Sequence, residues 1–199
     1  MIVLGLTGSI GMGKSSAAAA LRRLGVPVHD ADAEVHRLQA PGGAALPAIA
    51  AAFPGAVTQG RLDRARLRAM LQADPAGWPR LEAIIHPLVQ QAERRFIARA
   101  AARRAPGVVL DIPLLFESGG EVRCDATIVV SAPPFIQHAR VLRRPGMTEA
   151  QFAAMLARQM PDAEKRRRAD FVVPTGLDRR QTLRALRKIL RIVGIRENP

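Results

Sequence analysis

The chain has 199 residues, 48% of them hydrophobic and 24% charged, so its composition excludes a disordered protein and allows one sizeable core. Apolar stretches of about 18 residues or more do not occur, which excludes a transmembrane helix, and the single cysteine, Cys124, excludes an internal disulfide, as is usual in a reducing cytoplasm. The formal net charge of +13 fits a partner that carries several phosphates, although a general bias toward arginine explains the excess equally well.

The opening of the chain predicts a strand, a glycine-rich turn and a helix. Ile2–Leu6 is an apolar run that predicts a buried strand, and because it shows neither a basic region nor a cleavage site we expect no secretion signal. The turn that follows matches the pattern G-x-x-x-x-G-K-[ST], with fixed positions at Gly8, Gly13, Lys14 and Ser15. In this context the pattern predicts a phosphate-binding P-loop, which we favour over a strand–helix turn with an incidental lysine.

Each residue type in this motif suits phosphate binding. Glycines let the backbone adopt positive φ angles, so that successive N–H groups form a concave site for the β-phosphate. The N-terminus of the following helix adds the positive end of its dipole. Lys14 can reach the β- and γ-phosphates, and the Ser15 hydroxyl is a suitable Mg²⁺ ligand.

Two aspartates follow the next apolar segment. After a helix expected at residues 16–24, Val26–Val28 predicts a short strand that leads to Asp30 and Asp32. Ligands bind at the carboxyl edge of open α/β sheets, and residues two apart on an extended chain point to the same side. We therefore expect one or both carboxylates to face the γ-phosphate. The alternative is that Asp32 only caps a helix that begins near Ala33.

A mostly helical region comes next. The expected helices cover residues 33–40, residues 44–53, a segment after the N-cap Asp63, residues 76–86, and a long helix that starts at His86-Pro87. Such an insert usually covers the acceptor side of the site. Its arginines form either a solvated face or an anion-binding surface; they are Arg61, Arg64, Arg66 and Arg68. His86 is either a structural histidine or a substrate contact.

Three further strands are expected after this region. Val108–Ile112 predicts a buried strand with Asp111 near its end, where an acid can hold Mg²⁺ directly or through water, and Glu117 follows at the same sheet edge. Ala126–Ser131 and Asp170–Val173 predict the other two. The alternation of strands and helices predicts an α/β fold with a parallel sheet of about five short strands.

Between the last two strands, two helices are joined by a Pro-Gly turn. The first carries Arg140, Arg143 and Arg144. The second begins at a capping box, Thr148–Gln151. Arginine-lined helices form lids in phosphoryl transfer, where they bring arginine to the transferring group; the alternative is an amphipathic hairpin with a charged outer face. Asp178 is expected to cap a C-terminal helix.

Together these segments resemble dephospho-CoA kinase, a P-loop kinase family, over almost the whole chain. The residues that carry the resemblance are Leu6–Ser15, Asp30–Asp32, His86–Val89, Asp111–Glu117, Arg158–Met160 and Ala169–Val173. The P-loop alone indicates only phosphate binding. The D-A-D, H-P and D-I-P-L-L-F-E runs, in that order and near those spacings, are much more specific.

The resemblance implies the last step of coenzyme A synthesis, in which ATP phosphorylates the 3′-hydroxyl of the dephospho-CoA ribose. It implies a P-loop kinase-like three-layer fold with ATP and Mg²⁺ as cofactors. The implied parts are a nucleotide-binding core at residues 1–35, 105–135 and 165–199, a helical CoA-binding insert at residues 36–104, and a helical lid at residues 136–164.

The resemblance also implies roles for individual residues. The catalytic residues are Asp32 as the base that orients the ribose hydroxyl, Lys14, and Arg140 as the lid arginine on the ATP phosphates. The nucleotide-binding residues are Gly8, Gly11, Met12, Gly13, Lys14, Ser15, Ser16, Arg140 and Thr175. The substrate-binding residues are Asp32, His86, Leu115 and Glu117, and the Mg²⁺ residues are Ser15, Asp30 and Asp111.

The chain departs from the common family pattern in three places. Ser9 stands where glycine is usual and Ser16 where threonine is usual, and both side chains are small. Pro174-Thr175 replaces the usual Asp-Asn after the last strand. We therefore expect backbone groups around Thr175-Gly176 to take the place of that asparagine near the adenine.

Two other functions stay open. A different small P-loop kinase, acting on a nucleotide or a sugar, shares the P-loop and lid and differs in the acceptor insert. A P-loop regulator that binds nucleic acid fits the charge of +13, but the charge is scattered, the acids cluster at the strand ends, and only 4% of the residues are aromatic.

As a kinase, the protein is expected to be a cytoplasmic monomer or weak homo-oligomer whose partner is a small molecule, with no requirement for nucleic acid or membrane.

Overall fold

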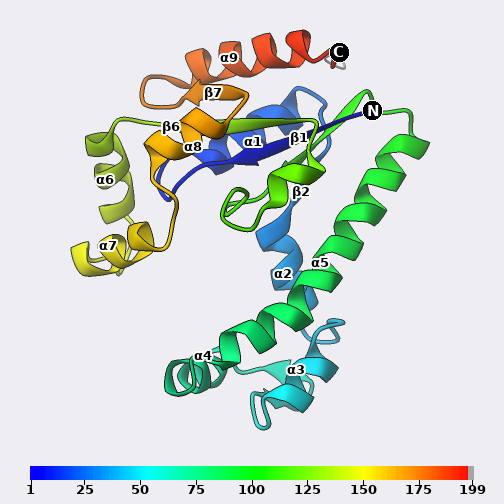
Figure 1. Ribbon diagram of the computed structural model, residues 1–199, viewed down its shortest axis with the longest axis vertical. Helices are drawn as coiled ribbons and strands as arrows, with labels where there is room; N and C mark the ends of the chain where they lie inside the picture. The colour runs from blue at the N-terminus through cyan, green and yellow to red at the C-terminus, as the bar shows by residue number, and fades with distance from the viewer. Residues whose placement is uncertain (197–199) are drawn as a thin grey trace. The chain divides into compact units, whose positions relative to one another are not determined.

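Residues 1–196 are described by the computed structural model, and their largest sheet has five strands in the order β2-β5-β1-β6-β7 (Figure 1). The strands are β1 (Ile2–Thr7), β2 (Val28–Asp30), β5 (Gly107–Asp111), β6 (Ala126–Ser131) and β7 (Phe171–Pro174). The central strand β1 pairs in parallel with β5 and β6, and β6 pairs in parallel with β7. The prediction of an α/β fold with about five short parallel strands is confirmed.

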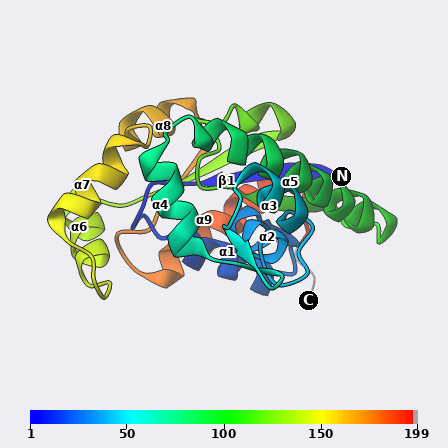
Figure 2. The same cartoon turned by 90° about the horizontal axis from the view of Figure 1, so that it is seen from below.

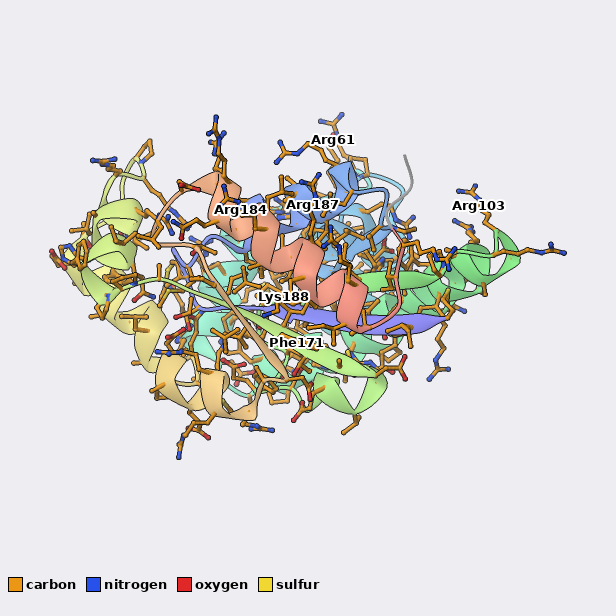
Figure 3. The ribbon with its side chains drawn as sticks, turned by 90° about the horizontal axis from the view of Figure 1, so that it is seen from above. Arg61, Arg103, Phe171, Arg184, Arg187 and Lys188 are labelled. Carbon is orange, nitrogen blue, oxygen red and sulfur yellow. The ribbon has the colours of Figure 1, made fainter. Side chains whose placement is uncertain are left out.

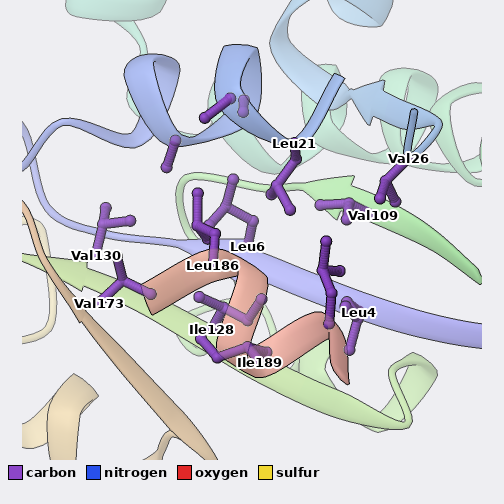
Figure 4. Packing of buried hydrophobic residues seen from close by; sticks show 14 of the residues in the cluster. Leu4, Leu6, Leu21, Val26, Val109, Ile128, Val130, Val173, Leu186 and Ile189 are labelled. Atoms are coloured by element: carbon purple, nitrogen blue, oxygen red, sulfur yellow. The ribbon is translucent and has the colours of Figure 1, made fainter. Parts of the chain in front are cut away.

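Alternating side chains of the strands enter two different layers. Leu4 and Leu6 of β1 pack in one hydrophobic cluster with helices α1 (Lys14–Arg23) and α9 (Arg179–Ile192) (Figure 4). Gly5, between them, faces the other side, where a Cβ atom would lie 2.7 Å from Leu115 and 2.8 Å from the Cys124 sulfur. Because residues two apart on a strand share a face, the sheet separates a helical layer from a layer built by the segment after β5.

Helix α9 packs against one face of the five-stranded sheet. Its N-cap is Asp178, whose carboxylate accepts from the backbone N–H of Gln181 at 2.7 Å, as predicted. Leu186, Ile189 and Leu190 are buried in the cluster, whereas the opposite face is basic. Arg184 and Lys188 are exposed on that face (Figure 3), so part of the positive charge of the chain is displayed to solvent here.

Three helices lie between β6 and β7, where the sequence predicted two, and the third extends past residue 164, the end of the predicted lid. They are α6 (Pro134–Leu142), α7 (Glu149–Ala157) and α8 (Asp162–Arg168). The capping box is confirmed, because Thr148 accepts from the Gln151 backbone N–H while the Gln151 side chain accepts from the Thr148 backbone N–H. A short 3₁₀ helix (Gly120–Arg123) precedes β6.

Backbone contacts divide the chain into two compact units, one of residues 1–29 together with the chain from Arg99 onward, and the other of Asp30–Ala98. The second unit contains α2 (Ala31–Leu38), α3 (Leu46–Ala52), α4 (Arg64–Ala73) and most of α5 (Gly77–Ala102), which Figure 2 shows from below. Its own core includes buried residues of every one of these helices, among them Leu38, Ile49, Leu67, Leu71 and Ile85. The end of the predicted nucleotide-binding core, residues 197–199, lies outside the described residues.

One expected helix boundary in the second unit is wrong. The sequence predicted that one helix ends and another begins at His86-Pro87, but α5 runs from Gly77 through Ala102 with Pro87 inside it. Proline removes one backbone hydrogen bond and is unfavourable inside a helix. Here Ile85 on one side of it and Leu88 on the other both pack in the core of the unit, and this burial carries the helix through the proline.

A small hairpin was missed in the same unit. Strands β3 (Val57–Thr58) and β4 (Arg61–Leu62) pair antiparallel where the sequence predicted only helices and a turn. The loop between them is two residues long, and Gln59 and Gly60 have φ angles of 50° and 70°. Two consecutive positive φ angles define the tight turn that fits a hairpin; glutamine rarely adopts this conformation, so the local signal was weak.

Within the described part of the chain, no helix combines the length and the apolar character that crossing a bilayer requires.

Candidate active site

The P-loop occupies the turn between β1 and α1. Gly11 and Gly13 have φ angles of 77° and 87°, and Gly13 is the residue that precedes the first turn of α1. Gly8 has no room for a side chain, because a Cβ atom there would lie 2.4 Å from Val130 of β6. The three predicted P-loop glycines are thus needed for two different reasons, left-handed backbone at two of them and close approach of β6 at the third.

The P-loop lysine meets the acid at the end of the neighbouring strand. Lys14 Nζ donates to Asp111 Oδ1 at 2.7 Å. The parallel register of β1 and β5 places Asp111 beside Leu6, so the carboxyl ends of the two strands coincide. The lysine side chain is 16% exposed and the aspartate 3%, which puts this ion pair at the base of the loop. Lys14 is therefore held at the carboxyl edge of the sheet, where its ammonium group can bind an anion.

Two glutamines hold the backbone of Ile10 from the lid region. Gln137 Nε2 of α6 donates to the Ile10 carbonyl at 2.8 Å, and Gln159 Oε1, just after α7, accepts from the Ile10 N–H at 3.0 Å. Helix α6 also packs on Gly11, where a Cβ atom would lie 2.6 Å from Val141. The start of the predicted lid is therefore packed against the P-loop in this structure.

Thr175 connects three parts of the site. Its hydroxyl donates to the carbonyl of Met12 at 2.6 Å and lies 3.2 Å from the carbonyl of Ser131 at the end of β6. Its own carbonyl accepts from Arg140 Nη2 at 2.6 Å, while Arg140 Nη1 lies 3.4 Å from the carbonyl of Gly11. The segment after β7, the P-loop and the predicted lid arginine thus meet at one residue that is only 7% exposed.

The remaining predicted nucleotide-binding residues lie around this centre. Met12 is 2% exposed, and its sulfur accepts from the Ala132 N–H at 3.1 Å, so only its backbone is available to a ligand. Ser15 and Ser16 are exposed in the first turn of α1. The structure brings all nine residues predicted for nucleotide binding, together with Asp111, to one end of the sheet.

The oxygen atoms at this end are compatible with a magnesium ion. The exposed Ser15 hydroxyl and the Asp111 carboxylate are hard oxygen donors, the type that Mg²⁺ prefers. No group of three or more His, Cys, Asp or Glu side chains that could hold a metal occurs among residues 1–196. A Mg²⁺ ion here would keep water and phosphate oxygens as its other ligands, which is its usual mode of binding with nucleotides.

The aspartate pair is arranged differently from the prediction. Asp30 is the last residue of β2 and the N-cap of α2, where its Oδ1 accepts from the Ala33 N–H at 2.9 Å. Asp32 lies inside the first turn of α2 and is exposed. The two therefore do not share one side of an extended chain, and the N-cap is Asp30 rather than Asp32. The helix begins earlier than expected because the Asp30 side chain satisfies a free N–H of its first turn.

His86, the other predicted substrate contact of the second unit, is exposed on α5. A structural histidine would be expected to be buried with a hydrogen-bond partner, so its exposure argues against that role, and contact with a substrate stays a prediction. Of the arginines in this unit, Arg64 lies 3.0 Å from the His36 ring nitrogen and, like Arg61, Arg66 and Arg68, is exposed.

Leu115 and Glu117 are held in the first unit by contacts of their own. Leu115 is fully buried against the sheet. Glu117 Oε1 lies 2.8 Å from Lys165 Nζ and accepts from the Met160 N–H at 2.9 Å. Lys165 is 0% exposed, so this carboxylate balances a buried charge. Substrate binding by Leu115 and Glu117 stays a prediction beside these packing and pairing roles.

The sequence agrees with this geometry when it is compared with known proteins. The family model for dephospho-CoA kinase matches residues 2–177. A dephospho-CoA kinase of Paramagnetospirillum magneticum is 64% identical over 166 residues, which are 83% of this chain and 78% of that protein.

The chain belongs to the dephospho-CoA kinase family. Solved structures agree with this kinase fold. A Thermus thermophilus protein matches with a TM-score of 0.82 and 38% identity over 96% of both chains. The fold is also that of the dephospho-CoA kinase from Campylobacter jejuni, with a TM-score of 0.71 and 21% identity over 95% of this chain and 97% of that one.

Two residues of the kinase site were given no role by sequence reasoning. Gln159 belongs to a run that carries the family resemblance, but the sequence does not say what its amide contacts. Gln137 was not singled out at all, although it shares a buried helix face with Val141, four residues on. A glutamine on an otherwise apolar helix face is the signal that could have found it, since a buried amide needs partners.

Proposed function

We propose that this kinase transfers the γ-phosphoryl group of ATP to the ribose 3′-hydroxyl of dephospho-CoA, giving coenzyme A and ADP. The observation that carries this proposal is the P-loop with its Lys14–Asp111 pair, in a chain that belongs to the dephospho-CoA kinase family. The P-loop supplies the phosphate site, and family membership supplies the acceptor.

On the nucleotide side, the protein acts by positioning and charge neutralisation. We assign the β- and γ-phosphates to the backbone N–H groups of the loop from Gly8 to Gly13 and to the Lys14 ammonium. Arg140 comes from α6, and its guanidinium already lies beside Gly11 and Thr175. There it would stabilise charge on the transferring group.

Ser15 and Asp111 are the residues in the first unit that would hold Mg²⁺, with Asp30 as a further candidate. When bound, the ion would neutralise charge on the phosphate oxygens. Asp111 also pairs with Lys14, so the same carboxylate keeps the lysine in place at the end of the sheet.

On the acceptor side, we assign Asp32 as the residue that orients the ribose hydroxyl for in-line attack. A carboxylate is a weak base, so it would accept the proton late and mainly position the nucleophile. Its exposure in the first turn of α2 leaves the carboxylate accessible to a substrate. The exposed His86 and the exposed arginines of the Asp30–Ala98 unit are candidates for contacts with the phosphates of dephospho-CoA.

The proposal extends to the setting of the enzyme. We infer a cytoplasmic monomer or weak homo-oligomer that acts on a small molecule and requires neither nucleic acid nor membrane. The positive charge fits two substrates that both carry phosphates.

The test is ADP release in a coupled assay with ATP and a panel of acceptors. The panel contains dephospho-CoA, adenosine, nucleoside monophosphates and simple sugars, and a parallel titration measures binding of a generic RNA. We expect turnover with dephospho-CoA and a product with the mass and chromatographic retention of coenzyme A. Turnover with another acceptor only, or salt-dependent RNA binding without turnover, would overturn the proposal.

A further inference from the structure

Two buried polar side chains hold carbonyl groups of the P-loop from outside. Gln137 Nε2 donates to the Ile10 carbonyl at 2.8 Å, and Thr175 Oγ1 donates to the Met12 carbonyl at 2.6 Å. Both residues are 7% exposed, and they lie 127 and 163 residues from their partners in the sequence. We call these two hydrogen bonds, Gln137–Ile10 and Thr175–Met12, the carbonyl clamp.

The carbonyl clamp sets the direction of the amide groups that a phosphate would contact. In a trans peptide group the C=O and the following N–H point in opposite directions, and residues 1–196 contain no cis peptide bond. With the Ile10 carbonyl directed at Gln137, the Gly11 N–H points away from α6. With the Met12 carbonyl directed at Thr175, the Gly13 N–H points away from Thr175. A cradle for an anion requires its N–H groups to be turned inward in this way.

The two glycines make such outside support necessary. Gly11 and Gly13 adopt φ angles of 77° and 87°, and glycine rotates away from any one conformation more readily than other residues. Side chains cannot restrain these positions, because a Cβ atom would lie 2.6 Å from Val141 at Gly11 and 3.1 Å from the Thr175 hydroxyl at Gly13. Within the loop the Met12 N–H donates to the Ser9 carbonyl at 3.1 Å, and hydrogen bonds from neighbouring elements hold the Ile10 and Met12 carbonyls.

We propose that Gln137 and Thr175 are positioning residues that preorganise the P-loop for the nucleotide without contacting it through their side chains. The proposal rests on the proposed function in one respect, since the P-loop is taken to bind ATP. It goes beyond that function because it assigns nucleotide affinity to two side chains outside the motif.

Thr175→Val is the principal test, since it removes the hydroxyl and nearly preserves the shape of the side chain. Thr175→Ser keeps the hydroxyl and should restore binding. Thr182→Val is the matched control, because Thr182 is also 7% exposed and its hydroxyl bonds carbonyls outside the P-loop, those of Pro174 at 3.2 Å and Asp178 at 3.3 Å.

Calorimetric titration with ADP and with ATP measures nucleotide affinity without turnover. We expect Thr175→Val to weaken both by about tenfold, the effect of an unsatisfied buried carbonyl in the loop. The KM for ATP should rise similarly, with a smaller change in kcat and an unchanged KM for dephospho-CoA. Thr175→Ser should remain close to wild type, and Thr182→Val should bind nucleotide like wild type with a comparable loss of thermal stability.

Gln137→Met tests the other half of the carbonyl clamp independently, and we expect it also to weaken ADP binding several-fold. Wild-type ADP affinity in both Thr175→Val and Gln137→Met would overturn the proposal, as would an equal loss in Thr182→Val. If the wild-type protein binds ADP but shows no turnover with dephospho-CoA, the proposed function fails, and the ADP titrations still decide the clamp.

Discussion

The P-loop and the segment Asp30–Leu38 are alike in sequence position but are held in different ways. The P-loop joins β1 to α1, whereas the other segment is Asp30, the last residue of β2, followed directly by helix α2. The P-loop is bonded by residues 97 to 163 positions away, including Asp111, Gln137 and Thr175. In the other segment, Asp30 accepts from the Ala33 N–H and Glu34 accepts from Arg37, each three residues away, and the longest bond described joins His36 to Arg64, 28 residues away.

This difference separates two ways of building a site. A loop rich in glycine has no preferred conformation of its own, so distant elements must fix it. A helix N-terminus with a capping carboxylate is ordered by its own sequence. Substitutions at residues that bond the P-loop but lie far from it in the sequence should therefore change nucleotide binding. Substitutions near Asp32 should change only the rate of the chemical step or the local stability of the helix.

The largest effect is expected at Asp32. Asp32→Asn should lower kcat by about 10²–10⁴-fold, the usual contribution of a general base, with little change in the ATP affinity. Because Asp32 is exposed, the free energy of unfolding should hardly change. Steady-state kinetics and a urea titration measure the two quantities. Glu34→Gln removes a charge from the same first helical turn and should keep kcat; near-wild-type turnover in Asp32→Asn would exclude Asp32 as the base.

Glu117 tests whether long-range contacts near the site are structural. Glu117→Gln leaves the fully buried Lys165 without its countercharge, so we expect a loss of about 3–5 kcal/mol in the free energy of unfolding. Asp74→Asn is the control, because the Asp74–Arg80 pair is 56% exposed on both sides and should contribute at most about 1 kcal/mol. A raised KM for dephospho-CoA without loss of stability would instead make Glu117 a substrate contact.

A substitution at Lys14 tests whether the P-loop binds the phosphates of ATP. Lys14→Ala should lower kcat/KM for ATP by about 10²–10³-fold, because one preorganised charge on the transferring group is lost. The measurement is initial rate against ATP concentration at saturating dephospho-CoA. Lys188→Ala, at an exposed lysine of α9, should leave the rate unchanged. An undiminished kcat/KM for ATP in Lys14→Ala would contradict the P-loop assignment.

The smallest effect is expected at the helix cap of α2. Asp30→Ala removes the acceptor for the Ala33 N–H and should cost about 1 kcal/mol of unfolding free energy, while Asp30→Asn should cost much less because asparagine caps as well as aspartate. Urea unfolding followed by circular dichroism measures both. A loss several times larger in Asp30→Ala would show that this segment also depends on contacts from elsewhere.

The outcome at particular residues shows where sequence reasoning reached its limit. The five strands of the large sheet, the P-loop and the caps at Asp63, Thr148 and Asp178 were predicted because the spacing of hydrophobic residues and the capping residues are local features of the sequence. The continuous helix through Pro87 was not, because packing on both sides outweighed a local breaker. Glu117 was assigned to substrate binding, and its pairing with Lys165 could not be foreseen from residues 48 positions apart.

By itself, the sequence determined the α/β class, the phosphate-binding loop, and, through its family motifs, the reaction. Those features depend on residues close together in the chain, whose spacing dictates hydrogen bonds and side-chain faces. Tertiary structure alone decided which side chains hold the loop: Gln137, Gln159 and Thr175 reach it from other elements. The physical reason is that glycine peptide groups take their orientation from their surroundings, and those surroundings exist only after the strands and helices have packed.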